Sequence, residues 1–239
     1  MDTPTGQDKL AQARATCRGD ARLPGLCKHA YPWRELERQA LDRDGAVAIV
    51  GYGSLLNPDS ARRTMPDTPT DGHEPVIAVG ARRVFDYAMS PAGANRHGPI
   101  EHPMQRAALN TVWTRDPQDA ITGRLLRVST ADLPALRERE RGYHLAGVLY
   151  VPWNHPRATP RVGCVLTADA EPVDGVVHTD ASLLPHQRYT AICLEGARRV
   201  DPAFEHAFIQ TTWLGDRVTP LSDYLNGIRD GLSDASTPT

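Results

Sequence analysis

A short apolar run passes without interruption into a glycine-rich turn, and this junction constrains the fold more than any other part of the sequence. The run covers Ala46–Val50, and Gly-Tyr-Gly-Ser-Leu-Leu follows at positions 51–56. Glycine on both sides of Tyr52 lets the chain turn in ways that other residues resist, and it leaves backbone N–H groups accessible. Asn-Pro-Asp-Ser at positions 57–60 then favours the start of a helix. The segment predicts a buried strand followed by a loop of backbone donors that can bind an anion.

The size and charge of the chain limit the classes of protein to which it can belong. Its 239 residues suffice for one large domain or two small ones with a substantial core. Lys and Arg total 27 against 29 Asp and Glu, whereas a nucleic-acid-binding domain is typically strongly basic. No apolar run approaches the roughly 18 residues that span a membrane, and the N-terminus has no basic-then-apolar signal. We therefore expect a cytoplasmic protein without a nucleic-acid or membrane partner, and we make no prediction of its oligomeric state.

The cysteine and histidine patterns favour neither a disulfide framework nor a metal site. The four cysteines contain no Cys-x-x-Cys pair, so free thiols are expected, with a bridge between Cys17 and Cys27 as the alternative. The nine histidines include no His-Glu-x-x-His motif, and those of the loop around His97 have no carboxylate or cysteine at ligand spacing. We predict that the protein uses no metal and no cofactor.

Six segments have the composition of β-strands, because each is rich in branched or aromatic residues and bounded by Pro, Gly or Asp. They are 46–51, 75–88, 106–114, 120–128, 146–152 and 162–168. Long helical connections between them are mostly missing, which disfavours a doubly wound parallel sheet. The pattern predicts an α+β protein with a mainly antiparallel sheet or barrel.

Helices are expected at the two ends of this strand-rich region and once within it. They are 34–43, 130–141, 186–200, 202–212 and about 220–229. The polar segment before the first strand is typical of an extension that packs on the domain or stays partly disordered. We divide the chain into an N-terminal extension at 1–44, a main domain at 45–230 and a flexible tail at 231–239.

A second motif lies about ninety residues after the glycine-rich loop. The helix at 130–141 ends in Arg-Glu-Arg-Glu-Arg-Gly-Tyr at positions 137–143. A solvated face of alternating charges is the simplest interpretation, since surface ion pairs are common and contribute little. The Gly-Tyr pair, however, ends the helix sharply and places Glu140 at the end of an element, where functional groups are often held over a pocket. Glu138 lies two residues away and cannot share its face of the helix.

The two motifs together resemble the γ-glutamylcyclotransferase family, and the leucine in the loop is closer to its ChaC-like branch. Gly-Tyr-Gly-Ser-Leu at 51–55 is similar to the family's signature loop, and Arg-Glu-Arg-Gly-Tyr at 139–143 to the stretch that holds its catalytic glutamate. Other similar blocks are Ala-Arg-Arg-Val-Phe at 81–85, the strand Ile-Thr-Gly-Arg-Leu-Leu-Arg-Val at 121–128, and Tyr-Thr-Ala-Ile at 189–192 with Gly-Ala at 196–197. The blocks follow the family's order over roughly residues 46–228.

The resemblance implies a small β-barrel flanked by helices, with a pocket at its mouth. The implied activity is a carbon–nitrogen lyase or acyltransferase reaction, in which the α-amino nitrogen of a γ-glutamyl group attacks its own δ-carbonyl. The products are 5-oxoproline and an amine, amino acid or dipeptide, with glutathione among the candidate substrates. Glu140 is the implied catalytic acid–base. The implied substrate-binding residues are Tyr52, Gly53, Ser54, Leu55, Tyr143 and Tyr189.

Several assignments stay open at this stage. The loop amides bind either the substrate's α-carboxylate, which the resemblance favours, or a developing oxyanion. Tyr52, Tyr143 and Tyr189 are either pocket residues or ordinary buried tyrosines, and Arg83 is either a substrate ligand or an exposed arginine on a sheet. The three arginines around Glu140 are expected to lower its pKa.

Three other functions are alternatives to the cyclotransferase hypothesis. A related enzyme of the same fold would remove a γ-glutamyl protecting group during biosynthesis. A binding or regulatory module would keep the barrel without turnover. A hydrolase with Ser54 as nucleophile is a further alternative, although no histidine lies at a suggestive spacing.

Overall fold

The computed structural model describes residues 4–41, 45–68, 73–100, 102–169, 172–173 and 175–234. The strands are β1 (Lys28–His29), β2 (Ala46–Gly51), β3 (Pro75–Val79), β4 (Ala81–Ala88), β5 (Ala107–Trp113), β6 (Ala120–Ser129), β7 (His144–Pro152), β8 (Arg161–Thr167) and β9 (Thr212–Leu214). The α-helices are α1 (Gly6–Cys17), α2 (Arg34–Leu41), α3 (Pro58–Arg62), α4 (Pro91–Asn95), α5 (Leu133–Arg139), α6 (Gln187–Arg198), α7 (Pro202–Gln210) and α8 (Leu221–Asp234). Two 3₁₀ turns, η1 (Leu23–Gly25) and η2 (Ser54–Leu56), complete the elements.

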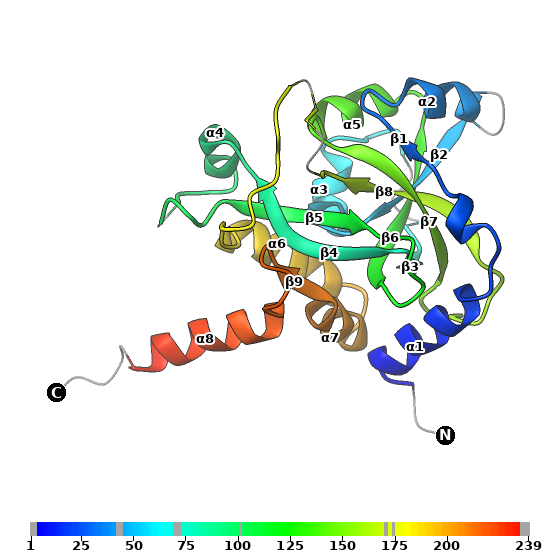
Figure 1. The fold of residues 1–239 in the computed structure, drawn as a ribbon. Helices are drawn as coiled ribbons and strands as arrows, with labels where there is room; N and C mark the ends of the chain where they lie inside the picture. The colour runs from blue at the N-terminus through cyan, green and yellow to red at the C-terminus, as the bar shows by residue number, and fades with distance from the viewer. Residues whose placement is uncertain are drawn as a thin grey trace.

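Five strands close into a barrel (Figure 1). The order is β7–β3–β6–β2–β8, and β8 pairs again with β7. Four of these contacts are antiparallel, and the fifth joins β2 to β8 in parallel through Ile49 and Cys164. Closure leaves these strands without a free edge. The predicted α+β class, with a small and mainly antiparallel β-barrel flanked by helices, is confirmed.

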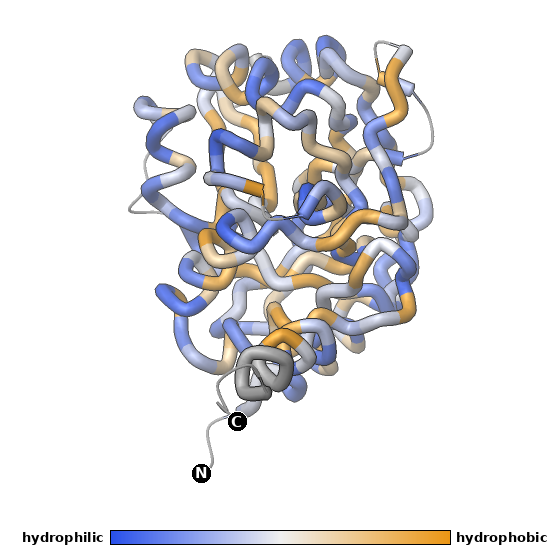
Figure 2. The backbone as a smooth tube through the Cα atoms, turned by 90° about the vertical axis from the view of Figure 1, so that its left-hand side faces the viewer, coloured by the Kyte–Doolittle hydropathy of each residue, from blue (hydrophilic) through white to orange (hydrophobic). Residues whose placement is uncertain are grey.

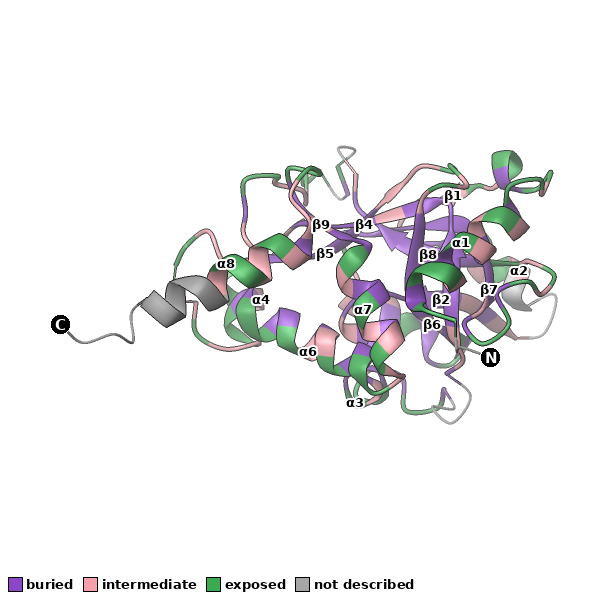
Figure 3. Cartoon of the chain, turned by 90° about the horizontal axis from the view of Figure 1, so that it is seen from below, coloured by how far each residue is buried: buried purple, intermediate pink, exposed green. Residues whose placement is uncertain are grey.

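Much of the barrel is buried on both faces because other elements cover the outside. Eight consecutive residues of β7, from His144 to Val151, are buried. This burial explains why β7 is apolar almost throughout and does not alternate between polar and apolar residues. Figure 3 shows buried strands surrounded by helices with exposed outer faces, and Figure 2 shows hydrophilic segments mainly at the periphery. The core therefore extends from the barrel interior to the layer between barrel and helices.

One predicted strand, 75–88, is wrong because it is two strands in different sheets. β3 belongs to the barrel, whereas β4 lies between β5 and β9 in a separate three-stranded sheet. The chain changes direction at Gly80, which has φ of +103°, a conformation that side-chain-bearing residues rarely adopt. The apolar composition is continuous across this glycine, so the composition gave no sign of the break.

The N-terminal segment packs against the barrel. α1 contacts α7 and β3, and β1 adds to the barrel through two residue pairs with β7. Helix α1 was not predicted, because its buried positions include small residues such as Gly6 and Ala13 that give little apolar signal. Trp33 is fully buried, and its indole N–H donates to the carbonyl of Tyr143 at 3.0 Å. The segment therefore supports the backbone next to the second sequence motif.

The remaining predicted elements differ from the structure mainly at their ends. The helix predicted at 130–141 is α5, which is shorter, and α8 continues to Asp234, four residues into the segment expected to be a flexible tail. Residues 235–239 of that segment lie outside the described residues. All four cysteines are free, as expected. Among the described residues, every helix is too short or too polar to cross a membrane.

Candidate active site

The glycine-rich loop follows β2 and leaves three backbone donors free. The amides of Leu56 and Asn57 donate to the carbonyls of Gly53 and Ser54 at 2.9 and 3.2 Å, which closes the η2 turn. Within the described part of the chain, the amides of Gly53, Ser54 and Leu55 donate to no protein acceptor. Three adjacent free N–H groups at the start of a helical turn form a site for an anion or an oxyanion.

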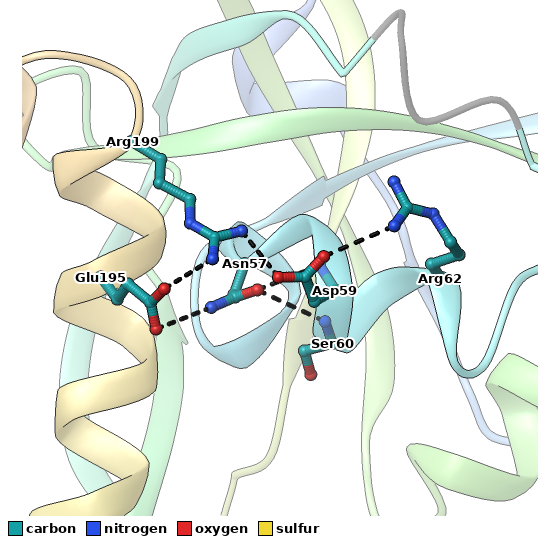
Figure 4. A network of polar contacts seen from close by, with 6 residues as sticks. All are labelled: Asn57, Asp59, Ser60, Arg62, Glu195 and Arg199. Carbon is teal, nitrogen blue, oxygen red and sulfur yellow. Dashed lines mark hydrogen bonds and ion pairs between the residues drawn. The ribbon is translucent and has the colours of Figure 1, made fainter.

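A polar network fastens this loop to α6 (Figure 4). The side chain of Asn57 accepts from the amide of Asp59 at 3.0 Å, which caps α3, and it donates to Glu195 at 3.4 Å. Arg199 contacts Glu195 at 2.6 Å and Asp59 at 2.8 Å. Because Asn57 is buried while the charged groups are about half exposed, the amide is the specific part of the connection. Helix α6 therefore sets the position of the loop.

Gly53 also meets α6 directly, at Tyr189. A Cβ atom on Gly53 would lie 2.6 Å from the Tyr189 hydroxyl, which is closer than any side chain tolerates. Glycine at this position is thus required for the approach of the tyrosine to the loop. The same contact places the hydroxyl beside the free amides.

Glu140 lies at the C-terminal end of α5, as its position in the sequence predicted. It is the C-cap residue, and the chain turns into β7 through Gly142, which has φ of +104°. Its side chain is only 13% exposed, and Arg139 is its ion-pair partner, with 3.0 Å between Nε and Oε1. The second carboxylate oxygen makes no hydrogen bond within the described residues. Glu140 therefore presents a partly desolvated carboxylate with one oxygen free.

The pKa of Glu140 lies above its ordinary value, contrary to the expectation from the sequence. Burial raises the pKa, and the ion pair and hydrogen bond with Arg139 lower it by less than burial raises it. Arg137 instead pairs with Glu37 at 2.6 Å, and Arg141 pairs with Glu138 at 2.8 Å. The expectation that three arginines lower this pKa is wrong, because burial outweighs the effect of Arg139 and the other two arginines contact other carboxylates.

Arg139 connects Glu140 to the loop. Besides its contact with Glu140, it donates to Ser54 Oγ at 3.0 Å and to Ser60 O at 2.9 Å. It also donates to Thr64 Oγ1 at 2.8 Å. A single guanidinium with its rigid fork of donors thus fixes the carboxylate relative to the glycine-rich loop and α3. Ser54 accepts from Arg139 and, among the described residues, has no histidine as hydrogen-bond partner, so the geometry offers no base for a serine nucleophile.

The three predicted tyrosines are all buried, and two of their hydroxyls donate within the protein. Tyr52 donates to the carbonyl of Leu166 at 2.6 Å, and Tyr143 donates to that of Leu109 at 3.0 Å. Burial raises the pKa of Tyr52, Tyr143 and Tyr189 well above 10, so the hydroxyls stay protonated. Tyr52 and Tyr143 therefore contribute ring surface to the site, and their donors are already used.

The structure brings every residue predicted for the site around one small inner cavity. The predicted residues that line it are Tyr52, Gly53, Ser54, Leu55, Glu140, Tyr143 and Tyr189. Leu109 and Leu166 complete the wall. The cavity adjoins an outer cleft of about 1440 Å³, whose lining shares Ser54, Glu140, Tyr143 and Tyr189 with it. Within the described residues, no group of three or more His, Cys, Asp or Glu side chains is arranged to hold a metal ion.

Both sequence interpretations of Arg83 are wrong. The residue is not exposed, and it lines neither the cleft nor the inner cavity, since its side chain is completely buried behind the loop. It donates to the carbonyls of Tyr52 and Thr122 at 3.1 and 2.9 Å, and its guanidinium stacks on Phe208 at 3.8 Å. Arg83 therefore joins the loop to the barrel and α7.

Two features were not predicted from the sequence. They are the contacts by which Arg139 connects Glu140 to the glycine-rich loop, and the outer wall of the cleft. Arg139 belongs to the predicted motif, but Glu and Arg alternate there. The sequence therefore does not show which of the three arginines contacts Glu140 until the end of the helix is known. Tyr87 stacks on Tyr143 with ring centroids 4.3 Å apart, and His178 stacks on the other side of Tyr87 at 5.6 Å. Tyr87 and His178 come from β4 and from the segment before α6. The sequence gives no local signal that these segments meet.

Comparisons with known proteins show similarity only among solved structures. No protein-family model matches the sequence, and no curated protein matches it. YkqA from Bacillus subtilis aligns with 73% of this chain at 15% identity and a TM-score of 0.47, and the alignment covers 56% of YkqA, little more than half of its length. A gamma-glutamyl cyclotransferase aligns with 68% of this chain and 84% of its own at 13% identity and a TM-score of 0.48. An uncharacterized protein from Homo sapiens aligns with 69% of this chain and 87% of its own at 13% identity and a TM-score of 0.49. At such values the chemistry has to be inferred from the side chains of this chain.

Proposed function

We propose that the protein is a γ-glutamylcyclotransferase-like enzyme that converts a γ-glutamyl group to 5-oxoproline. The substrate's α-nitrogen attacks its δ-carbon, a five-membered ring closes, and the amide bond to the leaving amine breaks. The attacking nitrogen starts as an ammonium group and loses two protons, and the leaving nitrogen gains two and leaves as an ammonium group, so the reaction balances without any co-reactant. Because the attack is intramolecular, the enzyme mainly has to fold the substrate and transfer these protons.

One observation carries this proposal. A buried carboxylate with a free oxygen, Glu140, faces the same small cavity as the three free amides of Gly53, Ser54 and Leu55. The amides suit the α-carboxylate of a glutamyl group, which would place its α-nitrogen within the reach of Glu140. An oxyanion formed on the δ-carbon is the other group that these donors could stabilise. Either arrangement needs a carboxylate and an anion site side by side.

The environment of Glu140 supports its role as acid and base. The α-ammonium group of the substrate must lose a proton before it attacks, and the leaving amine must gain one. Burial raises the pKa of Glu140 and so makes its carboxylate a stronger base than an exposed glutamate. Arg139 opposes this shift and at the same time holds Oε1 in place, which leaves the other oxygen for proton transfer.

Glu140→Gln tests the proposal, with Glu138→Gln as a matched control. Glutamine keeps the shape of Glu140 but cannot take up a proton, so release of 5-oxoproline should fall by about 10²–10⁴-fold. Glu138 carries the same group two residues away, but its side chain is 69% exposed and lines only the outer cleft, so its variant should keep proton transfer and lose far less activity than Glu140→Gln. The assay is 5-oxoproline release from a panel of γ-glutamyl amino acids, γ-glutamylamines and glutathione, with a circular dichroism check of folding.

The outcomes separate the competing functions. Full activity in the Glu140→Gln variant would overturn the proposed mechanism. Binding of γ-glutamyl compounds by the wild-type protein without any product would instead support a non-catalytic binding module. Turnover confined to one biosynthetic γ-glutamyl intermediate would identify a deprotecting enzyme of the same fold.

A further inference from the structure

The outer cleft is where the leaving group of a γ-glutamyl substrate has to lie. The inner cavity, with the free amides and Glu140, has a volume of only about 20 Å³, so a glutamyl group bound to these amides also fills the adjoining part of the cleft. The cleft of about 1440 Å³ adjoins it through Ser54, Glu140, Tyr143 and Tyr189. Any group attached to the δ-carbonyl therefore extends past Glu140 into the cleft. The residues that line the cleft consequently select the leaving group.

The charges of this cleft are unbalanced, although the chain as a whole is slightly acidic with a net charge of −2. Five arginines line the cleft against three carboxylates. The carboxylates already have partners, because Glu140 contacts Arg139, Glu138 contacts Arg141, and Asp180 accepts from Ser182. A concave surface with excess charge of one sign attracts ligands of the opposite sign.

Two of these arginines, Arg63 and Arg96, have no partner within the described residues. Each is the C-cap residue of a five-residue helix, Arg63 in α3 and Arg96 in α4, and both side chains line the cleft. Neither guanidinium group makes a hydrogen bond or an ion pair with the described part of the chain, and both residues are exposed. Arg139 also lies at the end of a helix, α5, so arginines from the ends of three separate helices line one cleft.

His97 lies within the electrostatic reach of three of these arginines. Burial lowers the pKa of His97 to about 4, and the charges of His186, Arg139, Arg96 and Arg63 contribute further. Three arginines from α3, α4 and α5 thus act on one imidazole, which also lines the cleft. At neutral pH the ring is uncharged, so it does not add to the positive charge and can donate or accept a hydrogen bond.

We propose that Arg63 and Arg96 are specificity-determining residues that select γ-glutamyl substrates whose leaving group carries carboxylates, with preference for an acidic amino acid that carries two. This inference rests on the proposed function, because it assigns the cleft to the leaving group. Each guanidinium can bind one carboxylate through two parallel hydrogen bonds. A leaving glutamate offers one carboxylate to each arginine, whereas a neutral amine offers none.

Three dipeptides of nearly identical shape measure this preference. They are γ-glutamyl-glutamate, γ-glutamyl-glutamine and γ-glutamyl-glutaminamide, whose leaving groups carry two, one and no carboxylates. Ion pairs with exposed guanidinium groups contribute up to about 1 kcal/mol each, so kcat/KM should fall by up to about fivefold with each carboxylate removed. The double variant Arg63→Ala/Arg96→Ala should compress the series to within about threefold. Added salt should reduce the preference of the wild-type enzyme, since it screens exposed charges.

Arg62→Ala is the matched control for loss of a positive charge. Arg62 adjoins Arg63 in sequence, is 58% exposed and contacts Asp59, and it does not line the cleft. Its variant should keep the graded series. Arg63→Lys/Arg96→Lys should restore part of the preference, because lysine keeps the charge but not the planar pair of donors.

Binding measurements separate failure of this inference from failure of the proposed function. Calorimetry of the same dipeptides with the Glu140→Gln variant reports affinity without turnover. A graded series of dissociation constants that the double variant flattens supports the assignment of Arg63 and Arg96, whether or not the wild-type protein releases 5-oxoproline. Equal affinities for the three dipeptides would overturn it, as would a graded series that persists in the double variant. No binding of any dipeptide would overturn both.

Discussion

Replacement of Arg83 by methionine should strongly destabilise the protein. Arg83 is completely buried on β4, and the structure gives it no carboxylate partner among the described residues. Its guanidinium makes six hydrogen bonds, three to backbone carbonyls and three to threonine hydroxyls. These contacts join β4 to β6, β9, α7 and the glycine-rich loop. Methionine fills much of the same volume but leaves these acceptors without the donor.

The expected loss follows from the acceptors that keep no other partner. Thr211 and Thr212 retain hydrogen bonds to the carbonyls of Ala207 and Phe208. Tyr52 O and Thr122 Oγ1 lose the only donor that the described structure gives them. Two buried groups left unpaired cost about 1–3 kcal/mol each, and removal of the desolvated charge offsets part of this. We expect the free energy of unfolding to fall by about 2–4 kcal/mol.

The adjacent residue provides a control on the same strand. Arg82 points to the opposite side of β4, where its side chain is 42% exposed and contacts Asp119 at 3.0 Å. An exposed ion pair contributes at most about 1 kcal/mol, so Arg82→Met should change stability little. Both variants lose one arginine from the same strand and gain the same side chain. Their difference therefore isolates burial and hydrogen bonding.

Urea unfolding, followed by the fluorescence of the buried Trp33 and Trp153, measures both variants under identical conditions. Equal slopes for the transitions would show that only stability has changed. A loss below about 1 kcal/mol in Arg83→Met, or a loss equal to that of Arg82→Met, would refute the reasoning. It would mean that the loop and barrel do not depend on this guanidinium.

Three further predictions concern the site. Arg139→Met should raise the pKa of Glu140, because it removes the positive charge that opposes the effect of burial. Since only the ionised base is active, the acid limb of the pH profile of kcat/KM should move to higher pH. A limb that does not move would exclude Glu140 as the titrating base. Gly53→Ala should lower activity by at least about tenfold, because the added methyl group would lie 2.6 Å from the Tyr189 hydroxyl. The double variant with Tyr189→Phe removes that hydroxyl and should recover part of the activity. No recovery would show that the loss has another cause. Asn57→Ala should reduce the free energy of unfolding by about 1 kcal/mol, because it removes the N-cap of α3. Thermal denaturation can detect this change, and an unchanged melting temperature would contradict the role of the cap.

Local sequence was sufficient for features that depend on neighbouring residues. Apolar runs bounded by turn residues gave β2, β5, β6, β7 and β8 to within about two residues, because burial and turn formation act over short distances. The glycines of the loop indicated free backbone donors for the same reason. Glu140 could be placed at the end of a helix from the Gly-Tyr pair that follows it.

Long-range contacts decided what the sequence left open or gave wrongly. The break at Gly80 depends on β3 and β4 joining different sheets, and the burial of Arg83 depends on acceptors from four other elements. The direction of the Glu140 pKa shift depends on its burial, and only the folded structure shows that Arg139, and neither Arg137 nor Arg141, is its ion-pair partner.

The sequence by itself thus determined the strands, the loop of free amides and the candidate base, because each follows from the conformational preferences of adjacent residues. Tertiary structure alone brought Gly53 and Glu140 to one cavity, turned Arg83 inward and directed Arg63 and Arg96 into the cleft beside it. These arrangements arise from packing between segments up to a hundred or more residues apart. Burial and the choice of ionic partner, which set the charge and reactivity of each group, are properties of that packing.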